Sequence, residues 1–188
     1  MSDKIIIHVD GVQGSGKSFI CSKIKKILCI DTDDIMKKAI KIIEDSQNTN
    51  KKYPRTINQM KKIEKQIVNQ YISNNDKIIF VGMNPDIPLP THKFFIKITD
   101  FSAVYKRLLL RELEKIVLNH NKIKKHIIEE NNPKEIDIFR IADMSVVFPV
   151  SYDEFLEDYK ERLKEAKTKK YLAKTQEQII YAINKIID

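Results

Sequence analysis

The stretch Gly11-Val12-Gln13-Gly14-Ser15-Gly16-Lys17-Ser18 has a glycine, four free positions, and then Gly-Lys-Ser. Glycines let successive backbone N–H groups turn inward and approach a polyphosphate, which a Cβ atom would obstruct. A lysine at position 17 reaches the β- and γ-phosphates, and a serine hydroxyl at position 18 can bind Mg²⁺. This stretch, called the Gly11–Ser18 loop below, therefore predicts a phosphate-binding site.

The sequence on both sides of the loop fits this prediction. Residues 4–10 are an apolar run rich in β-branched side chains, as in a buried parallel strand. After the loop, apolar residues recur at helical spacing: Phe19, Ile20, Ile24, Ile27 and Leu28. The alternative is a glycine-rich turn in an ordinary strand–helix unit. Because strand, glycine turn and amphipathic helix are the required context, we expect residues Gly11 to Phe19 to bind a nucleoside triphosphate.

Length and composition predict the class of protein. A chain of 188 residues can build one substantial core, so we expect a single domain, 1–188. Its 42% hydrophobic and 32% charged residues are typical of a soluble globular protein. The sequence shows neither an apolar run of membrane-spanning length nor a signal peptide, which predicts a cytoplasmic protein with no membrane partner. Cys21 and Cys29 lack metal-ligand spacing and are expected to be two small, buried, reduced side chains.

The formal net charge of +8 favours anionic ligands. The lysines are spread along the chain instead of forming one block, so much of this charge is expected on solvated helix surfaces. An enzyme that handles phosphorylated substrates would also be basic. Nucleic acid is therefore a possible partner that the charge alone does not favour.

A second apolar patch, residues 27–30, leads into Asp31-Thr32-Asp33-Asp34 and then a helical pattern. Carboxylates just past a strand lie at the sheet edge where α/β proteins bind ligands. Thr32 or Asp33 could instead be the helix N-cap, and Asp34 could complement the helix dipole. Three acids in four positions beside a phosphate loop still favour at least one functional acid.

The rest of the chain alternates apolar runs with helical patterns. We expect a helix over about 56–73, strands at 77–83 and 92–98, a long helix capped by Thr99 and Asp100, a capping box at 151–154, a short strand at 170–174 and a last helix capped by Thr175. This alternation predicts an α/β fold, a doubly wound parallel sheet with helices on both faces.

Two classes of nucleotide-binding protein fit the sequence poorly. A GTPase switch would carry an Asn-Lys-x-Asp motif after a later strand, and the sequence has none. A motor-type ATPase would end its third strand in adjacent acids, whereas this strand ends Val81-Gly82-Met83-Asn84.

The chain resembles the P-loop small-molecule kinases, which include nucleoside monophosphate kinases and shikimate kinase. The resemblance rests on the Gly11–Ser18 loop, on Asp31 and Asp33 after the second strand, on Gly82 after the third, and on Arg107 and Arg111 on the helix after the fourth. It extends through the short strand near Tyr171 to the final helix. It implies a five-stranded sheet in the order 2-3-1-4-5, a mobile lid at about 119–150, and transfer of the γ-phosphate of ATP, with Mg²⁺, to an acceptor.

The chemistry of that reaction assigns roles, because phosphoryl transfer depends on positioning and charge neutralisation. Lys17 would be catalytic, and Ser18 would bind the metal. Asp33 would accept the acceptor's hydroxyl proton or, for a phosphate acceptor, help to order Mg²⁺. Asp31 would contact the substrate or join the metal shell. Gly82 would let the substrate lie against the backbone.

Arginine makes up only five of the 34 Lys and Arg residues. Where lysine is the usual cation, an arginine suggests that its planar guanidinium group is needed to bind phosphate. Arg107 and Arg111 lie four positions apart and could clamp the transferring phosphoryl group from one helix face. The alternative is surface ion pairing with glutamates of the same helix. Arg55 is a candidate for an acceptor's phosphate, Arg140 is a lid candidate, and Arg162 is expected to be solvated.

The acceptor itself is a hypothesis. A nucleoside or nucleoside monophosphate is the first choice. A polynucleotide 5′-hydroxyl is the second, because kinases of that kind also place an Asp-Asp such as Asp33-Asp34 after the second strand, and this chain is basic. A nucleotide-binding regulatory module without turnover is the third. The sequence does not indicate an oligomeric state.

Overall fold

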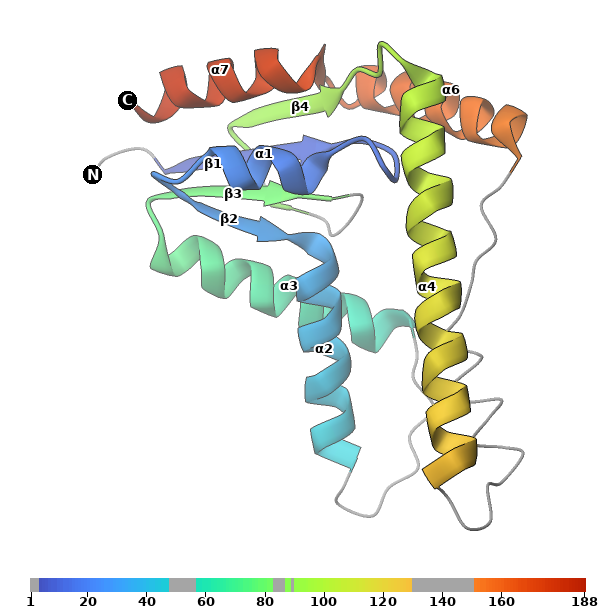
Figure 1. The fold of residues 1–188 in the computed structure, drawn as a ribbon. Coiled ribbons are helices and arrows are strands. Elements are labelled where there is room, and N and C mark those ends of the chain that lie inside the picture. The colour runs from blue at the N-terminus through green and yellow to red at the C-terminus, as the bar shows by residue number, and fades with distance from the viewer. Residues whose placement is uncertain (1–3, 48–56, 83–86, 89, 130–150) are drawn as a thin grey trace. The chain divides into compact units, whose positions relative to one another are not determined.

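A computed structural model describes residues 4–47, 57–82, 87–88, 90–129 and 151–188 (Figure 1). Five parallel strands form one sheet in the order β2-β3-β1-β4-β5. The strands are β1 (Ile5–Asp10), β2 (Leu28–Asp31), β3 (Lys77–Val81), β4 (His92–Ile96) and β5 (Leu172–Lys174). The predicted α/β fold class and the predicted strand order are confirmed.

Six helices occur among the described residues. They are α1 (Lys17–Lys23), α2 (Thr32–Gln47), α3 (Ile57–Asn74), α4 (Phe101–Glu129), α6 (Tyr152–Thr168) and α7 (Gln176–Ile187). Each one matches a helical pattern in the sequence, and α4 continues into the first part of the predicted lid at 119–150. The rest of that segment, 130–150, lies outside the described residues, so the lid stays a prediction.

The chain divides into two compact units, each described by itself. The first comprises residues 1–99 and 159–188, and the second comprises 100–158. The first unit contains the whole sheet together with the Gly11–Ser18 loop.

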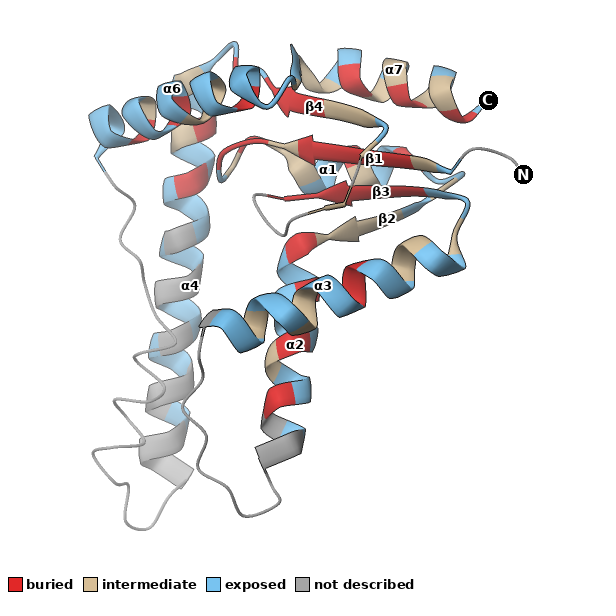
Figure 2. Ribbon diagram, turned by 180° about the vertical axis from the view of Figure 1, so that it is seen from behind, coloured by how far each residue is buried: buried red, intermediate tan, exposed pale blue. Residues whose placement is uncertain are grey.

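The centre of the sheet is β1, which pairs with β3 on one side and with β4 on the other. Because β1, β3 and β4 are apolar along most of their length, both faces of these strands can be covered, and Figure 2 shows them largely buried. Helices α1 and α7 cover one face through a cluster of buried residues: Ile7, Val9, Ile20, Ile24, Ile79, Val81, Phe94, Ile96, Ile179, Ile183 and Ile187.

Helices α2 and α3 cover the other face. Their buried cluster consists of Ile6, Ile35, Ala39, Ile67, Val68, Ile78 and Phe80. On α6, Tyr159 stacks at a tilt on Phe95 of β4, and its hydroxyl accepts a hydrogen bond from the backbone N–H of Ile98 at 3.3 Å. Burial of the Tyr159 ring raises the pKa of its hydroxyl. Helices on both faces of a parallel sheet give the doubly wound architecture.

In the second unit, the starts of α4 and α6 are fixed by caps that the sequence predicts. Asp100 Oδ1 accepts a hydrogen bond from the N–H of Ala103 at 2.9 Å, so Asp100 caps α4. Ser151 and Glu154 form the expected capping box, in which Glu154 Oε2 accepts from the N–H of Ser151 at 2.7 Å. The ring of Tyr105 on α4 contacts that of Phe155 on α6.

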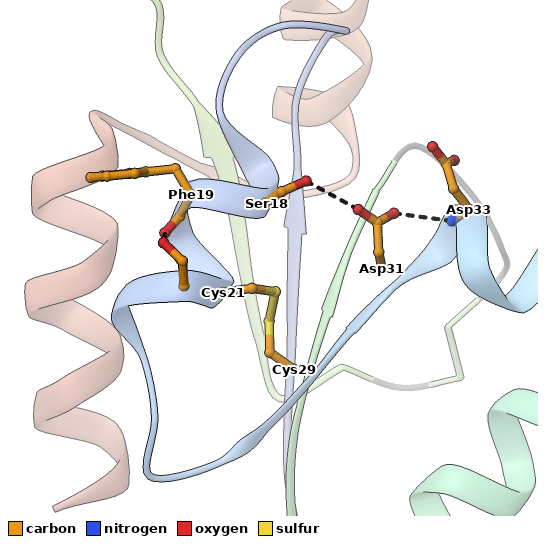
Figure 3. Close-up of a disulfide and its surroundings, with 7 residues drawn as sticks. Ser18, Phe19, Cys21, Cys29, Asp31 and Asp33 are labelled. Atoms are coloured by element: carbon orange, nitrogen blue, oxygen red, sulfur yellow. Dashed lines mark hydrogen bonds between the residues drawn. A yellow bond between two sulfur atoms is a disulfide. The ribbon is translucent and has the colours of Figure 1, made fainter.

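Cys21 and Cys29 form a disulfide, so the expectation of two buried, reduced cysteines is wrong. Cys21 lies on α1 and Cys29 on β2, with their Cα atoms 5.6 Å apart, a separation usual for disulfides. Each residue is only partly buried. The spacing of the two cysteines carries no local signal of a disulfide, whereas the packing of α1 beside β2 brings the two sulfur atoms together (Figure 3).

Candidate phosphate-binding site

The Gly11–Ser18 loop follows the carboxyl end of the central strand and runs into α1. Gly11 and Val12 are buried at its start, and Gln13 is exposed at its tip. The N–H of Ser15 donates to the carbonyl of Val12 at 3.2 Å and closes the turn. The loop thus lies at the sheet edge where parallel α/β proteins bind ligands, as predicted.

Gly16 shows why the loop needs glycine. Its φ of +87° lies in the left-handed region, and a Cβ atom there would lie 1.9 Å from Gln176 Nε2. Gly16 is also the N-cap of α1, which has neither a side-chain cap nor an acidic residue in its first turn.

Gln176 is a neighbour of the loop that the sequence analysis missed. It is the first residue of α7, and its Nε2 donates a hydrogen bond to the carbonyl of Ser15. Thr175 just before it forms a capping box with Gln178, which confirms the predicted cap. The signal that indicates Gln176 is its place after the last strand, at the same edge of the sheet as the loop.

The side chain of Lys17 folds back over the loop. Its Nζ donates to the carbonyls of Gly11 at 2.5 Å and Val12 at 2.9 Å. Burial lowers the pKa of Lys17, and the carboxylates of Asp10, Asp31 and Asp33 oppose that shift. The ammonium is therefore partly desolvated and faces acids and backbone oxygens, so a phosphate would offer it a charged acceptor.

Arg162 on α6 is a second cation that acts on this site. Its positive charge also lowers the pKa of Lys17, and its side chain is only partly exposed. The sequence analysis expected a solvated residue, because a lone arginine on an amphipathic helix gives no sign of its distant neighbour. Its charge is the smallest contribution to this pKa shift, so Arg162 is a neighbour of Lys17 and not a ligand-binding residue on this observation.

Ser15 carries an unsatisfied group in the loop. Its side chain is 1% exposed, and its Oγ has no hydrogen-bond partner among the described residues. Buried polar atoms are nearly always paired, and this hydroxyl lies beneath the start of the loop, 2.7 Å from the position that a Cβ atom at Gly11 would occupy.

Ser18 and Asp31 bring α1 and β2 together at this edge. Ser18 Oγ donates to Asp31 Oδ2 at 3.2 Å, and Asp31 Oδ1 accepts from the N–H of Asp33 at 3.0 Å (Figure 3). Asp31 thus provides the capping hydrogen bond at the start of α2, where the sequence suggested Thr32 or Asp33. The sequence locates a helix boundary only to within a residue or two, and the three possible caps, Asp31, Thr32 and Asp33, all fall within that range.

The remaining acids lie in the first turn of α2. The side chains of Asp33 and Asp34 are both exposed, and Asp34 pairs with Lys37 at 3.1 Å. The pairing fits a surface role for Asp34. Asp33 lies next to the Ser18–Asp31 hydrogen bond, so its predicted role in catalysis and metal binding remains open.

Gly82 follows β3 and packs against the first residue of α2. Its φ is +147°, and a Cβ atom would lie 1.7 Å from Thr32 Oγ1. The close packing against Thr32 explains why position 82 is a glycine. Its predicted contact with substrate stays a prediction.

His8 holds the carbonyl of Gly82 from β1. It is buried, as the sequence analysis expected of a packing residue, and its Nε2 lies 3.1 Å from the Gly82 oxygen. Because a carbonyl can only accept, Nε2 carries the proton, and Nδ1 accepts from the Tyr171 hydroxyl at 2.6 Å. Burial lowers the pKa of His8 and raises that of Tyr171 to about 12.

Four predicted arginines lie either in the second unit or outside the described residues. Arg107 and Arg111 lie exposed on α4 in the second unit. Arg55 and Arg140 lie outside the described residues. Their predicted roles toward the transferring group and the acceptor stay predictions.

The oxygen atoms of Ser18, Asp31 and Asp33 are suitable ligands for a magnesium ion whose other ligands would be phosphate oxygens and water. Within the described part of the chain, no three His, Cys, Asp or Glu side chains form a cluster that could hold a metal ion. Mg²⁺ in nucleotide sites usually takes only one or two carboxylates and completes its shell with phosphate oxygens and water. A hydroxyl and a carboxylate oxygen 3.2 Å apart beside the loop are donors of that kind.

Comparisons with known proteins do not place the chain in a family. No protein-family model matches it, and a search of the curated proteins finds no match. None of the helices in the described ranges is both long and apolar enough to cross a membrane.

Proposed function

We propose that the chain is an ATP-dependent phosphotransferase that moves the γ-phosphate of Mg·ATP to a small acceptor, a nucleoside or nucleoside monophosphate in the first instance. The observation that carries the proposal is the Gly11–Ser18 loop at the end of the central parallel strand, with the desolvated Lys17 ammonium folded over it.

Lys17 is the cation that receives the nucleotide. Its two hydrogen bonds to backbone carbonyls are replaced by bonds to phosphate oxygens, which are stronger acceptors because they are charged. The positive charge of Arg162 adds to the attraction for an anion. When bound, Mg·ATP supplies the phosphoryl group and the charge of the metal ion.

Ser18, Asp31 and Asp33 form the acidic side of the site. The Ser18 hydroxyl and the Asp31 carboxylate would hold the metal ion from α1 and β2. The exposed carboxylate of Asp33 would accept a proton from the acceptor's hydroxyl, and its position in the first turn of α2, next to Asp31, supports this role. Arg107 and Arg111 are proposed to stabilise the transferring group.

The test is transfer of labelled γ-phosphate from Mg·ATP to a panel of nucleosides, nucleoside monophosphates, small metabolites and 5′-hydroxyl oligonucleotides. Lys17→Ala is the blank. Lys25→Ala is the matched control, because Lys25 is an exposed lysine in the loop that follows the same helix. Label on a nucleoside or its monophosphate, lost in the blank and kept in the control, would support the proposal.

The panel also separates the two other functions. Label only on oligonucleotides would replace the acceptor with a polynucleotide 5′-hydroxyl, which the net charge of +8 would favour. Binding of ATP without transfer would indicate a regulatory module. Equal activity of Lys17→Ala and the unmodified chain would contradict a phosphate site at this loop.

A further inference from the structure

The Cys21–Cys29 disulfide joins the same two elements as the Ser18–Asp31 hydrogen bond (Figure 3). Ser18 lies three residues before Cys21 on α1, which places the two on one face of the helix. Asp31 lies two residues after Cys29 on β2, which places those two on one face of the strand. The covalent bond and the hydrogen bond are thus neighbouring links between one face of α1 and one face of β2.

From this geometry we propose that Cys21 and Cys29 form a reversible thiol–disulfide modification site that controls the metal side of the nucleotide site. In the oxidised form the disulfide keeps α1 and β2 at a fixed separation, so Ser18 and Asp31 stay within hydrogen-bond distance. In the reduced form this separation can vary, and the two metal-binding oxygens lose their fixed arrangement. The part that concerns Mg·ATP rests on the proposed function.

The reaction partner is a low-molecular-weight disulfide of the glutathione class. The thiolate of one cysteine attacks the reagent's sulfur and forms a mixed disulfide, which releases one reagent thiol. The second cysteine then attacks the mixed disulfide, so the Cys21–Cys29 bond forms and the second reagent thiol leaves. Two electrons and two protons pass from the chain to the reagent. Excess dithiol reverses the reaction.

Two features make this modification reversible without unfolding. Both cysteines are partly exposed, so a reagent can reach them. The loop between them is held by buried Ile24, whose N–H donates to the carbonyls of Ile20 and Cys21, and by Ile27 against the same core cluster. Reduction therefore removes one link while this packing remains. Disulfides of redox sensors form and break in this way, whereas structural disulfides persist.

The experiment compares the oxidised and reduced full-length chain by calorimetric titration with Mg·ATP and with ATP in excess EDTA. Alkylation under denaturing conditions followed by mass measurement verifies both states, since only the reduced chain exposes its two thiols. Reduction should cost about the free energy that one hydrogen bond contributes. We therefore expect it to raise the Kd for Mg·ATP about fivefold to tenfold. The Kd for metal-free ATP should change by less than about twofold, since the loop and Lys17 are not altered.

The double variant Cys21→Ser/Cys29→Ser provides the matched control. It should bind Mg·ATP like the reduced chain and show no response to oxidant. Should that variant fail to fold, the comparison of the two states of the unmodified chain still decides the question.

Three outcomes would overturn the proposal. Equal Mg·ATP affinity in both states would overturn the switch and leave the proposed function standing. An equal loss of affinity with and without metal would assign the disulfide to general stability. Absence of Mg·ATP binding in both states would overturn the proposed function together with the switch.

Discussion

Two strand-to-helix connections lie at the same edge of the sheet, and they differ in charge. Between β1 and α1 the chain places glycines and Lys17, and α1 begins with neither a side-chain cap nor an acid in its first turn. At the second connection β2 runs directly into α2: Asp31, the last residue of β2, caps the helix, and two acids, Asp33 and Asp34, lie in its first turn.

The difference shows how two helix starts at one edge of the sheet are adapted to opposite charges. A helix start favours negative charge, and α2 satisfies that preference with its own carboxylates. The β1–α1 connection instead carries a partly desolvated cation, Lys17, whose ammonium donates to two backbone carbonyls that charged phosphate oxygens could replace. The first connection is therefore suited to an anion from outside, and the second to a metal ion or a hydroxyl group.

Replacing Lys17 should remove the cation of the β1–α1 connection, and we expect it to give the largest effect. Lys17→Ala removes two charge-assisted hydrogen bonds to phosphate, which corresponds to about 10²–10³-fold in ATP affinity. Loss of charge stabilisation during transfer should lower turnover by a further ~10³-fold, a magnitude typical of cations that contact the transferring group. Calorimetry and labelled-phosphate transfer measure the two parts. Unchanged ATP affinity would contradict the assignment.

Replacing Asp33 tests the acidic side. As a general base its loss should reduce turnover by about 10²–10⁴-fold, and Asp33→Asn keeps the size of the side chain. The fold should persist, because this side chain is exposed. Asp34→Asn is the matched control, one residue further along the same turn and paired with Lys37. Full turnover in Asp33→Asn would exclude its catalytic role and leave Asp31 as the candidate.

The strands and the caps of α4, α6 and α7 could be predicted from sequence because their signals are local, whereas the strand order was implied by the resemblance to the P-loop small-molecule kinases. Buried parallel strands are continuous apolar runs, and capping boxes such as Ser151–Glu154 join residues three positions apart. The loop was predicted for the same reason, since its pattern is contiguous.

The contacts that complete the site could not be predicted, because they join distant parts of the chain. The hydrogen bond from Gln176 to the Ser15 carbonyl spans 161 positions. Arg162 acts on Lys17 from a helix near the other end of the chain. The Cys21–Cys29 bond depends on the packing of α1 beside β2, and an eight-residue spacing gives no sign of it.

Substituting Gly82 tests whether the β2–α2 connection is held by packing. In Gly82→Ala the new methyl group meets Thr32 Oγ1 at 1.7 Å and the backbone remains at a φ of +147°. We expect a loss of about 2–4 kcal/mol in the free energy of unfolding, from overpacking and backbone strain together. Denaturant titration measures it. Adding Thr32→Ala should recover only the part due to overpacking, and a loss below about 0.5 kcal/mol in Gly82→Ala would contradict the packing argument.

The smallest effect concerns His8, which lies on the strand before the first connection and holds Gly82 beside the second. Burial lowers the pKa of His8, and the positive charges of Lys93 and Lys169 act in the same direction. Asp10 and the hydrogen bond to Gly82 oppose the shift. Below pH 6.5 the unfolded chain therefore binds a proton that the folded chain resists, so stability should fall as the pH falls through this value.

One proton limits the size of that change to about 1.4 kcal/mol for each pH unit. Urea unfolding measured on both sides of pH 6.5 should show the slope in the unmodified chain and a shallower slope in His8→Gln. His120→Gln is the control, because His120 lies exposed on α4 in the second unit. The glutamine at position 8 keeps an N–H for the Gly82 carbonyl but cannot gain a proton, so it separates the hydrogen bond from the charge. An unchanged slope in His8→Gln would show that other groups cause the loss of stability at low pH. The β1–α1 and β2–α2 connections would then not depend on the charge of His8.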